Sequence, residues 1–235
     1  MATWLSIIIP ALNEARSLPH TLRAIEAAAI PGIEVLVADG GSTDATREIC
    51  AGFAVRLIES RRGRACQMNT AASQAQGRVL WFLHADTLLN ADCIEELRCF
   101  ERSPRFWGRF NIELSGTHPM FRVIELMINQ RSFLTGVATG DQGFFMKRDI
   151  FQIVGGFPEQ PLMEDLEMSY RLNRLESPVC SRKKLITSSR RWEQNGIGRT
   201  ILQMWWLRWR YYWGASANQL AKEYYPGFAS ETPSK

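Results

Sequence analysis

Apolar runs alternate with helical stretches over residues 1–90 of the chain. The apolar runs are rich in β-branched residues and span Leu5–Ile9, Ile33–Asp39, Val55–Glu59 and Val79–His84. Each run is nearly continuous rather than alternating with polar residues, which is typical of strands that are covered on both faces. The pattern therefore predicts an α/β fold with a mostly parallel sheet and helical crossovers. Ligands of such sheets bind beyond the carboxyl ends of the strands.

The pattern is less regular after Ala91 and predicts a mixture of helices and strands. We expect helices ending near Glu101, over Phe121–Ser132, from Glu164 to about Leu175 and from about Thr200 to Trp213, and strands over Phe106–Leu114, Phe144–Lys147 and Val179–Ile186. A glycine-rich segment, Thr139–Phe145, separates two of these elements. The last residues, Ser230–Lys235, are predicted to fray.

Composition places the chain among globular proteins. Its 235 residues, 46% of them hydrophobic, can bury a full core as one domain. The N-terminal apolar run is too short for a signal peptide or a membrane span, so we expect it to be a buried strand. The five cysteines are scattered without a Cys-x-x-Cys pair, which favours a reducing cytoplasm. The net charge of +4 does not indicate a nucleic-acid partner, whereas the many arginines suit an anionic substrate or lipid surface.

Polar residues follow the first predicted strand. Pro10, Asn13 and Glu14 place an amide and a carboxylate where a nucleobase or ribose would bind. Taken alone, the segment is explained better by Pro10 ending the strand and Asn13 capping the next helix.

The second predicted strand ends at Asp39, and two glycines follow it. The glycines allow a ligand to approach the backbone closely, and the Asp39 carboxylate could accept from a nucleobase N–H or a ribose hydroxyl. Ser42 or Asp44 is suited to capping the next helix, which is compatible with a ligand at Asp39.

Arginines follow the third predicted strand. Arg61, Arg64 and the amide of Gln67 lie where a helix begins, and guanidinium groups beside a helix N-terminus favour a diphosphate. An isolated cluster of this kind is usually a solvated surface, but its position at the sheet edge favours a binding role.

An acidic residue follows the fourth predicted strand. Ala85 and Asp86 lie near the centre of the same sheet edge, and Asp86 is our candidate metal ligand. Mg²⁺ and Mn²⁺ bind to one or two carboxylates together with substrate phosphates, so a full protein cage is not needed. His84 is more typical of a packing residue than of a ligand.

These segments, in this order, resemble the landmarks of family-2 glycosyltransferases, which are inverting enzymes with the Rossmann-like GT-A fold. The matching positions are Pro10/Asn13/Glu14, Asp39/Ser42/Asp44 and His84-Ala85-Asp86. The resemblance implies one GT-A domain over residues 1–235, in which 1–90 bind a nucleotide sugar, 91–199 form the acceptor and catalytic half, and 200–235 form an aromatic helix and tail. His84 departs from the family pattern, which has aspartate there. The chain is also similar to the small bacterial arsenosugar-biosynthesis subgroup.

A Glu-Asp pair resembles a further element of this family. The resemblance implies that Asp165 is the catalytic base and that Glu164 lies on the acceptor side. In inverting transfer, such a base takes the acceptor's proton while its oxygen attacks the anomeric carbon. Without the upstream segments, both acids would be explained by the preference of a first helical turn for negative charge.

Two other segments resemble acceptor-side elements of the family. Gly140, Asp141 and Gln142 match a glycine-rich acceptor segment, although a tight turn explains them equally well. Arg191 and Trp192 match part of an element of processive synthases, but the departure at the first position of that element argues against processive polymerisation. Trp192 is suited both to stacking on a sugar and to packing in the core.

The C-terminal stretch 204–213 is dense in aromatic residues and arginines. This composition is typical of a helix lying on anionic lipid, here at the inner face of the cell membrane. We expect Trp205, Trp209 and Tyr212 to share one helix face, and Trp206 and Trp213 another. Core packing or a homodimer interface therefore explains the stretch as well as peripheral membrane contact does.

The expected function is metal-assisted, non-processive and inverting sugar transfer. The donor is a nucleotide sugar, UDP-linked foremost, the cofactor is Mg²⁺ or Mn²⁺, and the acceptor is a hydroxyl of a small or lipid-linked molecule. A nucleotidyltransferase could use a similar sheet, but Pro10–Arg16 lacks the glycines and lysine of a triphosphate loop. A non-catalytic nucleotide-sugar-binding partner subunit would not need Asp165.

Overall fold

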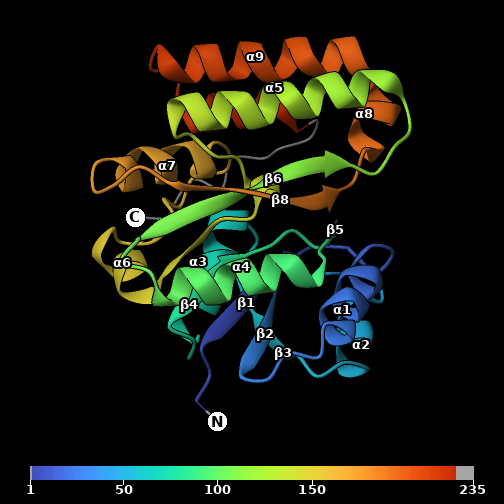
Figure 1. The fold of residues 1–235 in the computed structure, drawn as a ribbon. Coiled ribbons are helices and arrows are strands. Elements are labelled where there is room, and N and C mark those ends of the chain that lie inside the picture. Colours follow the sequence, from blue (N-terminus) through green and yellow to red (C-terminus); the bar gives the residue numbers. More distant parts are fainter. Residues whose placement is uncertain (1, 226–235) are drawn as a thin grey trace, which may run out of the picture.

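The computed structural model describes residues 2–225 and is built around one mixed sheet (Figure 1). The strands are β1 (Leu5–Ala11), β2 (Ile33–Asp39), β3 (Arg56–Glu59), β4 (Val79–Phe82), β5 (Thr87–Leu88), β6 (Trp107–Leu114), β7 (Phe145–Lys147) and β8 (Val179–Thr187). Their order in the sheet is β3-β2-β1-β4-β7-β6-β8-β5. The neighbours β3, β2, β1 and β4 are parallel, and β7 runs antiparallel to both β4 and β6. The short β7 thus joins the N-terminal parallel group to the parallel pair β6 and β8.

Helices connect these strands and cover the sheet. They are α1 (Leu18–Ala27), α2 (Thr46–Ala51), α3 (Arg64–Ser73), α4 (Ala91–Arg102), α5 (Pro119–Thr135), α6 (Arg148–Ile153), α7 (Glu164–Asn173), α8 (Arg190–Asn195), α9 (Ile197–Tyr212) and α10 (Ala217–Tyr224), with a 3₁₀ helix, η1 (Gly140–Gln142). The first three helices are the crossovers between β1, β2, β3 and β4, which brings the carboxyl ends of these strands to one edge.

The N-terminal strands are apolar throughout because both faces of the sheet are buried. In β1, Ile7 and Ile9 pack in a layer with α1 and α4, while Ile8 packs in the opposite layer with α3 and α7. Successive side chains of a strand point to opposite faces, so a strand between two helical layers needs apolar residues at every position.

The C-terminal half adds a layer of helices above β6 and β8 (Figure 1). Phe121 and Ile124 of α5 pack against Leu114 of β6, and Ile197 and Ile201 of α9 join the same cluster. The two long helices therefore lie side by side.

The predicted α/β class and the parallel N-terminal strands are confirmed. The fourth strand ends at Phe82 rather than at His84, because its pairing with β1 ends at Phe82, its pairing with β7 ends at Trp81, and residues 85–86 form a turn. The sequence did not predict β5, α6, α8 or α10. The predicted fraying tail, Ser230–Lys235, lies outside the described residues.

Candidate functional site

A pocket of about 470 Å³ lies at the carboxyl ends of β1 and β4. One side of it is formed by Pro10 near the end of β1, Glu14 after β1, and the residues after β4, which are His84, Ala85 and Asp86. Residues of η1, α7, α8, α9 and α10 form the other sides. The pocket is thus at the edge of the sheet where ligands of parallel α/β sheets bind.

The loops after β1 and β2 are bound to each other by side chains. Asn13 Oδ1 accepts a hydrogen bond from the Thr43 amide at 2.8 Å, and Ser42 Oγ accepts one from the Asn13 amide at 2.9 Å. Asp44 Oδ2 accepts from the Ala15 amide at 3.1 Å. Asn13 does not cap α1 and adopts a left-handed backbone with φ of 56°. Its role in the fold is to join the two loops, and it does not line the pocket.

Asp39 and Gln67 also lie outside the lining of the pocket. The Asp39 carboxylate is buried and accepts hydrogen bonds from the amides of Gly41 and Ser42 in its own loop. Gln67 Nε2 donates to the carbonyl oxygen of Ala11 at 2.7 Å and to a carbonyl of β2 at 2.8 Å. Both side chains fix the ends of β1 and β2.

Arginines from three elements lie around the pocket. Arg64, at the start of α3, places Nη1 3.4 Å from Glu164 Oε1. Arg190 and Arg208 also line the pocket, and neither guanidinium has a hydrogen-bond or ion-pair partner within residues 2–225. Arg61 is different: its side chain is 79% exposed and pairs with an acid outside the pocket. The cationic lining suits an anionic ligand such as a diphosphate.

Arg191 and Trp192 of α8 both line the pocket. The Arg191 guanidinium lies 4.4 Å from the ring centre of Tyr224 in α10, and burial lowers the pKa of Arg191. Trp192 is partly buried against Phe121 and Ile197. Its ring therefore packs in a core cluster and also contributes to the wall of the pocket.

Asp86 and Glu14 are acidic neighbours at the strand ends. Burial raises the pKa of the Glu14 carboxyl, and the Asp86 carboxylate raises it further. Across residues 2–225, the His, Cys, Asp and Glu side chains do not form a group of three that could hold a metal ion. The donors present still fit Mg²⁺ or Mn²⁺, since these ions complete their coordination with substrate phosphates and water.

Asp165 lies on the side of the pocket formed by α7. Its Oδ2 accepts from the Gly140 amide at 3.0 Å and its Oδ1 from the Leu166 amide at 2.8 Å. Met163, directly before α7, is buried and has φ of 65°, a left-handed conformation that is unusual for a residue with a Cβ. Burial raises the pKa of Glu164, and Arg64 offsets part of this rise. The strained turn and these contacts fix the start of α7 beside η1.

His84 is placed by packing against η1. A Cβ on Gly140 would lie 2.6 Å from His84 Nε2, so the ring needs a glycine at that position. His84 Nδ1 is 3.6 Å from Asp141 Oδ1. Burial and then Arg64 lower the pKa of His84, and this outweighs the opposite effect of three nearby aspartates. The neutral imidazole is therefore favoured.

The glycine-rich segment divides between the pocket and the core. Asp141 is about half exposed and lines the pocket. Gln142 is buried, forms a capping box with Thr139, and donates to the Phe110 carbonyl oxygen at 3.4 Å.

The sequence did not indicate the contribution of α9 to the pocket. The residues concerned are Thr200, Met204, Leu207 and Arg208. They are spaced i, i+4, i+7 and i+8, and this helical periodicity would have identified one common face.

Most aromatic residues at α9 are exposed, whereas Tyr211 is partly buried beside Leu207. Exposed fractions of 54% to 77% are found for Trp205, Trp206, Trp209, Tyr212 and Trp213. This exposure contradicts the alternative that these five side chains pack in the core. No helix between residues 2 and 225 combines the length and apolarity needed to cross a membrane.

A family comparison matches the first two thirds of the chain. Residues 6–151 match the model of glycosyl transferase family 2. The glycosyltransferase AglE of Haloferax volcanii is 26% identical over 176 residues, which cover 66% of this chain and 56% of that protein. The PGL/p-HBAD biosynthesis glycosyltransferase of Mycobacterium bovis is 37% identical over 107 residues, 42% of each chain. The chain thus spans about half the length of these curated relatives.

Two solved structures have a similar fold. S. aureus TarS in complex with UDP has a TM-score of 0.65 at 17% identity, covering 79% of this chain and 60% of that one. The mannosyltransferase PcManGT from Pyrobaculum calidifontis, in complex with GDP-Man and Mn²⁺, has a TM-score of 0.62 at 22% identity, covering 79% and 57%. These likenesses confirm the predicted GT-A-type fold. They do not bear on the arsenosugar subgroup.

Proposed function

Because the chain belongs to glycosyl transferase family 2, we propose that its pocket transfers a sugar from a nucleotide-diphosphate donor to an acceptor hydroxyl. One observation carries this proposal: the pocket brings Asp86, at the end of β4, and Asp165, at the start of α7, to the same cavity. An inverting transfer needs both a site for the donor's diphosphate and a base on the acceptor side.

We propose that the donor lies with its diphosphate near Asp86 and the pocket arginines. Arg64 and Arg190 line the pocket, and the role that we propose for them is to stabilise the charge that develops on the departing nucleoside diphosphate. The structural neighbours in complex with UDP or GDP-Man support a nucleotide sugar as donor. A UDP-sugar is our first choice.

Asp86 is the residue that we propose holds a divalent ion, with Glu14 beside it. A bound Mg²⁺ or Mn²⁺ would neutralise the diphosphate and favour its departure. The neighbour crystallised with Mn²⁺ supports a metal-dependent donor site.

Asp165 is the proposed base. Its two hydrogen bonds from backbone amides orient the carboxylate, so that it can take the proton of an acceptor hydroxyl as that oxygen attacks the anomeric carbon. Asp141, Glu164 and Trp192 line the same side and are proposed to position the acceptor. The processive element departs from its pattern at its first position, which is Ser188 here, and this supports a single transfer rather than polymerisation. The acceptor that we propose is small or lipid-linked.

We propose that residues 1–235 act as one catalytic domain, since the pocket takes residues from Pro10 to Tyr225. The cysteines are all free thiols, which supports a reducing compartment such as the cytoplasm.

The proposal is tested by the thermal stability of the purified protein with nucleoside diphosphates and nucleotide sugars, with and without Mn²⁺ or Mg²⁺. Ligand at 100 times its Kd should stabilise the native state by about 2.7 kcal/mol. We expect a metal-dependent rise in Tm with one nucleotide class. The variant Asp92→Asn, which changes an exposed acid paired with Lys183 outside the pocket, should show the same rise. If no nucleotide or nucleotide sugar changes the Tm, the chain does not bind a donor by itself.

A further inference from the structure

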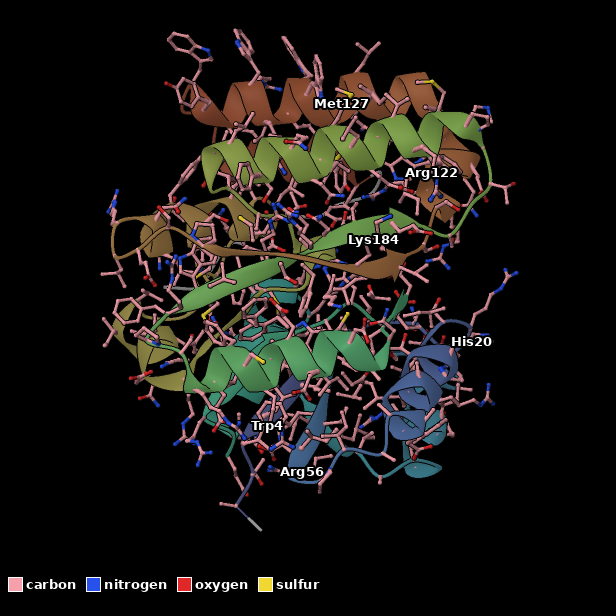
Figure 2. The ribbon with its side chains drawn as sticks, viewed as in Figure 1. Trp4, His20, Arg56, Arg122, Met127 and Lys184 are labelled. Carbon is pink, nitrogen blue, oxygen red and sulfur yellow. The ribbon has the colours of Figure 1, made fainter. Side chains whose placement is uncertain are left out.

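Two neighbouring helices present apolar side chains to solvent. We call this surface the α5–α9 face; it consists of Met120, Val123, Leu126, Met127, Phe133 and Leu134 of α5 and Leu202, Trp205, Trp206, Trp209, Tyr212 and Trp213 at α9, all between 41% and 78% exposed. Figure 2 shows side chains projecting from α9 away from the sheet, with Met127 of α5 on the same upper side. Contiguous exposed apolar surfaces of this kind mark interaction sites.

The α5–α9 face is separate from the parts of both helices that stabilise the fold. In α9, Thr200, Met204 and Leu207 point towards the pocket, on the opposite side of the helix from Trp206 and Trp209. In α5, Phe121 and Ile124 pack in the core cluster with Leu114 of β6, while the exposed apolar residues lie on the other side of the helix. The outer side chains are therefore not needed for the core.

Charge on the α5–α9 face is positive. Helix α9 contains no acidic residue, and the one acid of α5, Glu125, is buried and accepts from the Leu114 amide. Arg199 of α9 is exposed on the same side as Leu202, and its guanidinium has no ion-pair partner within residues 2–225. The two helices thus combine tryptophan, tyrosine and the unpaired Arg199 without an exposed carboxylate of their own, while Arg210 of α9 pairs with Glu223 of α10.

We propose that the α5–α9 face binds the surface of an anionic lipid bilayer. Tryptophan and tyrosine rings favour the headgroup level, where one end of the ring is apolar and the other is hydrated. The exposed Arg199 beside them would be attracted to anionic lipids. Helices that lie in the interface have this division between an apolar outer side and a polar inner side.

A second copy of the chain fits the α5–α9 face less well. In a two-fold symmetric dimer, the same residues of both copies would meet. The face offers no exposed acid of α5 or α9 to pair with Arg199 of the other copy, so each Arg199 would be buried without a partner from that face.

This inference deepens the proposed function on which it rests, because α9 forms both the bilayer surface and a wall of the pocket. Arg208 and Met204 line the pocket on one side of the helix, and Trp205 and Trp209 lie on the other. A docked protein would hold the acceptor side of its pocket close to the headgroups, which fits an acceptor hydroxyl carried on a lipid.

Vesicle binding tests the proposal directly. The full chain is mixed with phosphatidylcholine vesicles with or without phosphatidylglycerol, and bound protein is measured by sedimentation. We expect binding that requires phosphatidylglycerol and weakens as salt is added. Tryptophan fluorescence should shift to shorter wavelength at the same lipid concentrations, because the exposed indoles leave water.

Paired variants locate the surface. Trp205→Ser/Trp209→Ser should weaken vesicle binding by at least about tenfold, since two large apolar side chains are lost from the interface. The control is Ile153→Ser on α6, which removes a side chain that is 70% exposed on another surface and should bind vesicles like the unchanged protein. Circular dichroism verifies that both variants fold.

Three results would overturn the proposal. In the first, the unchanged protein binds neither kind of vesicle. In the second, the double tryptophan variant binds as well as the unchanged protein. In the third case, the unchanged protein is a dimer by light scattering, the double variant is a monomer, and neither binds vesicles. Nucleotide-dependent thermal stabilisation of the double variant separates this proposal from the proposed function. If the double variant loses vesicle binding but is still stabilised by nucleotide, the result supports the α5–α9 face as the membrane-binding surface. If the unchanged protein binds vesicles but no nucleotide stabilises it, only the proposed donor site is contradicted.

Discussion

Asp165 is held more tightly than a solvent-exposed acid in a first helical turn would be. The amide of Gly140 reaches it from η1, and the left-handed Met163 sets the direction in which α7 begins. The backbone cost of that conformation is of order 1–3 kcal/mol. Such strain is common at functional sites, and here it fixes the carboxylate at the pocket.

We predict that Asp165→Asn lowers the rate of nucleoside diphosphate release from the donor by about 10²–10⁴-fold, because the acceptor's proton then has no base to receive it. Donor binding should be nearly unchanged, since the amide keeps the shape of the side chain. Enzyme kinetics and thermal shift measure the two effects separately, with Asp92→Asn as the control. Equal losses of binding and rate would show that Asp165 holds the donor instead.

The proposed metal site at Asp86 can be tested through the metal dependence of nucleotide binding. Asp86→Ala should abolish the difference that Mn²⁺ or Mg²⁺ makes to nucleotide binding, because a single carboxylate at this position would carry the ion. Titration calorimetry with and without chelator measures this difference. A metal dependence that survives in the variant would assign the ion to Glu14 or to a more distant acid.

Among the elements of the fold, the strands could be predicted from the sequence better than the contacts between the loops that follow them. Continuous burial on both faces gave β1 and β2 an apolar pattern that can be read locally. The hydrogen bond between Asn13 and Thr43 leaves no such pattern, since it joins residues of two loops that come together only in the folded chain. The sequence therefore located the edge of the site, but it offered a donor contact or a helix cap for Asn13 and not the link between the two loops.

For the helices too, the sequence pattern predicted the element better than its contacts. The aromatic stretch predicted a helix, but periodicity does not say what lies against each face, so the sequence left open whether Trp206 is exposed or packed in the core. The short α10 was missed although Ser216 and Gln219 form a capping box, a signal that is visible in the sequence.

Replacing Gly108 or Gly198 by alanine should change the free energy of unfolding in opposite directions. In β6, a Cβ on Gly108 would collide with the ring of Phe145 and lie 2.6 Å from the Val179 carbonyl oxygen, so Gly108→Ala should lower the free energy of unfolding by about 1–3 kcal/mol. Gly198, in α9, has nothing within 4 Å of a Cβ, and Gly198→Ala should raise stability by about 0.5–1 kcal/mol. Urea denaturation measures both; equal signs would contradict the packing of β6 against β7 and β8.

At the scale of the whole molecule, the pocket depends on segments from both ends of the chain. The N-terminal strands supply Pro10 and Asp86, while α7, α8 and α9 supply the facing walls. β7 is the only strand within residues 2–225 that joins the two groups of parallel strands. A ligand that fills the pocket would therefore contact residues from the N-terminal group of strands and from the helices of the C-terminal half.

Hydrogen exchange can show whether the two sides act together. With nucleoside diphosphate and Mn²⁺, we expect slower amide exchange after β1 and β4 and also at the start of α7 and in α8, because a bound ligand lowers the population of open states of every segment that it contacts. Helices α2 and α6 do not line the pocket and should exchange at the same rate as in the free protein. Protection limited to the loops after β1 and β4 would mean that the donor binds the N-terminal half alone. In that case, α7 and its Asp165 would have to be brought to the donor by the acceptor.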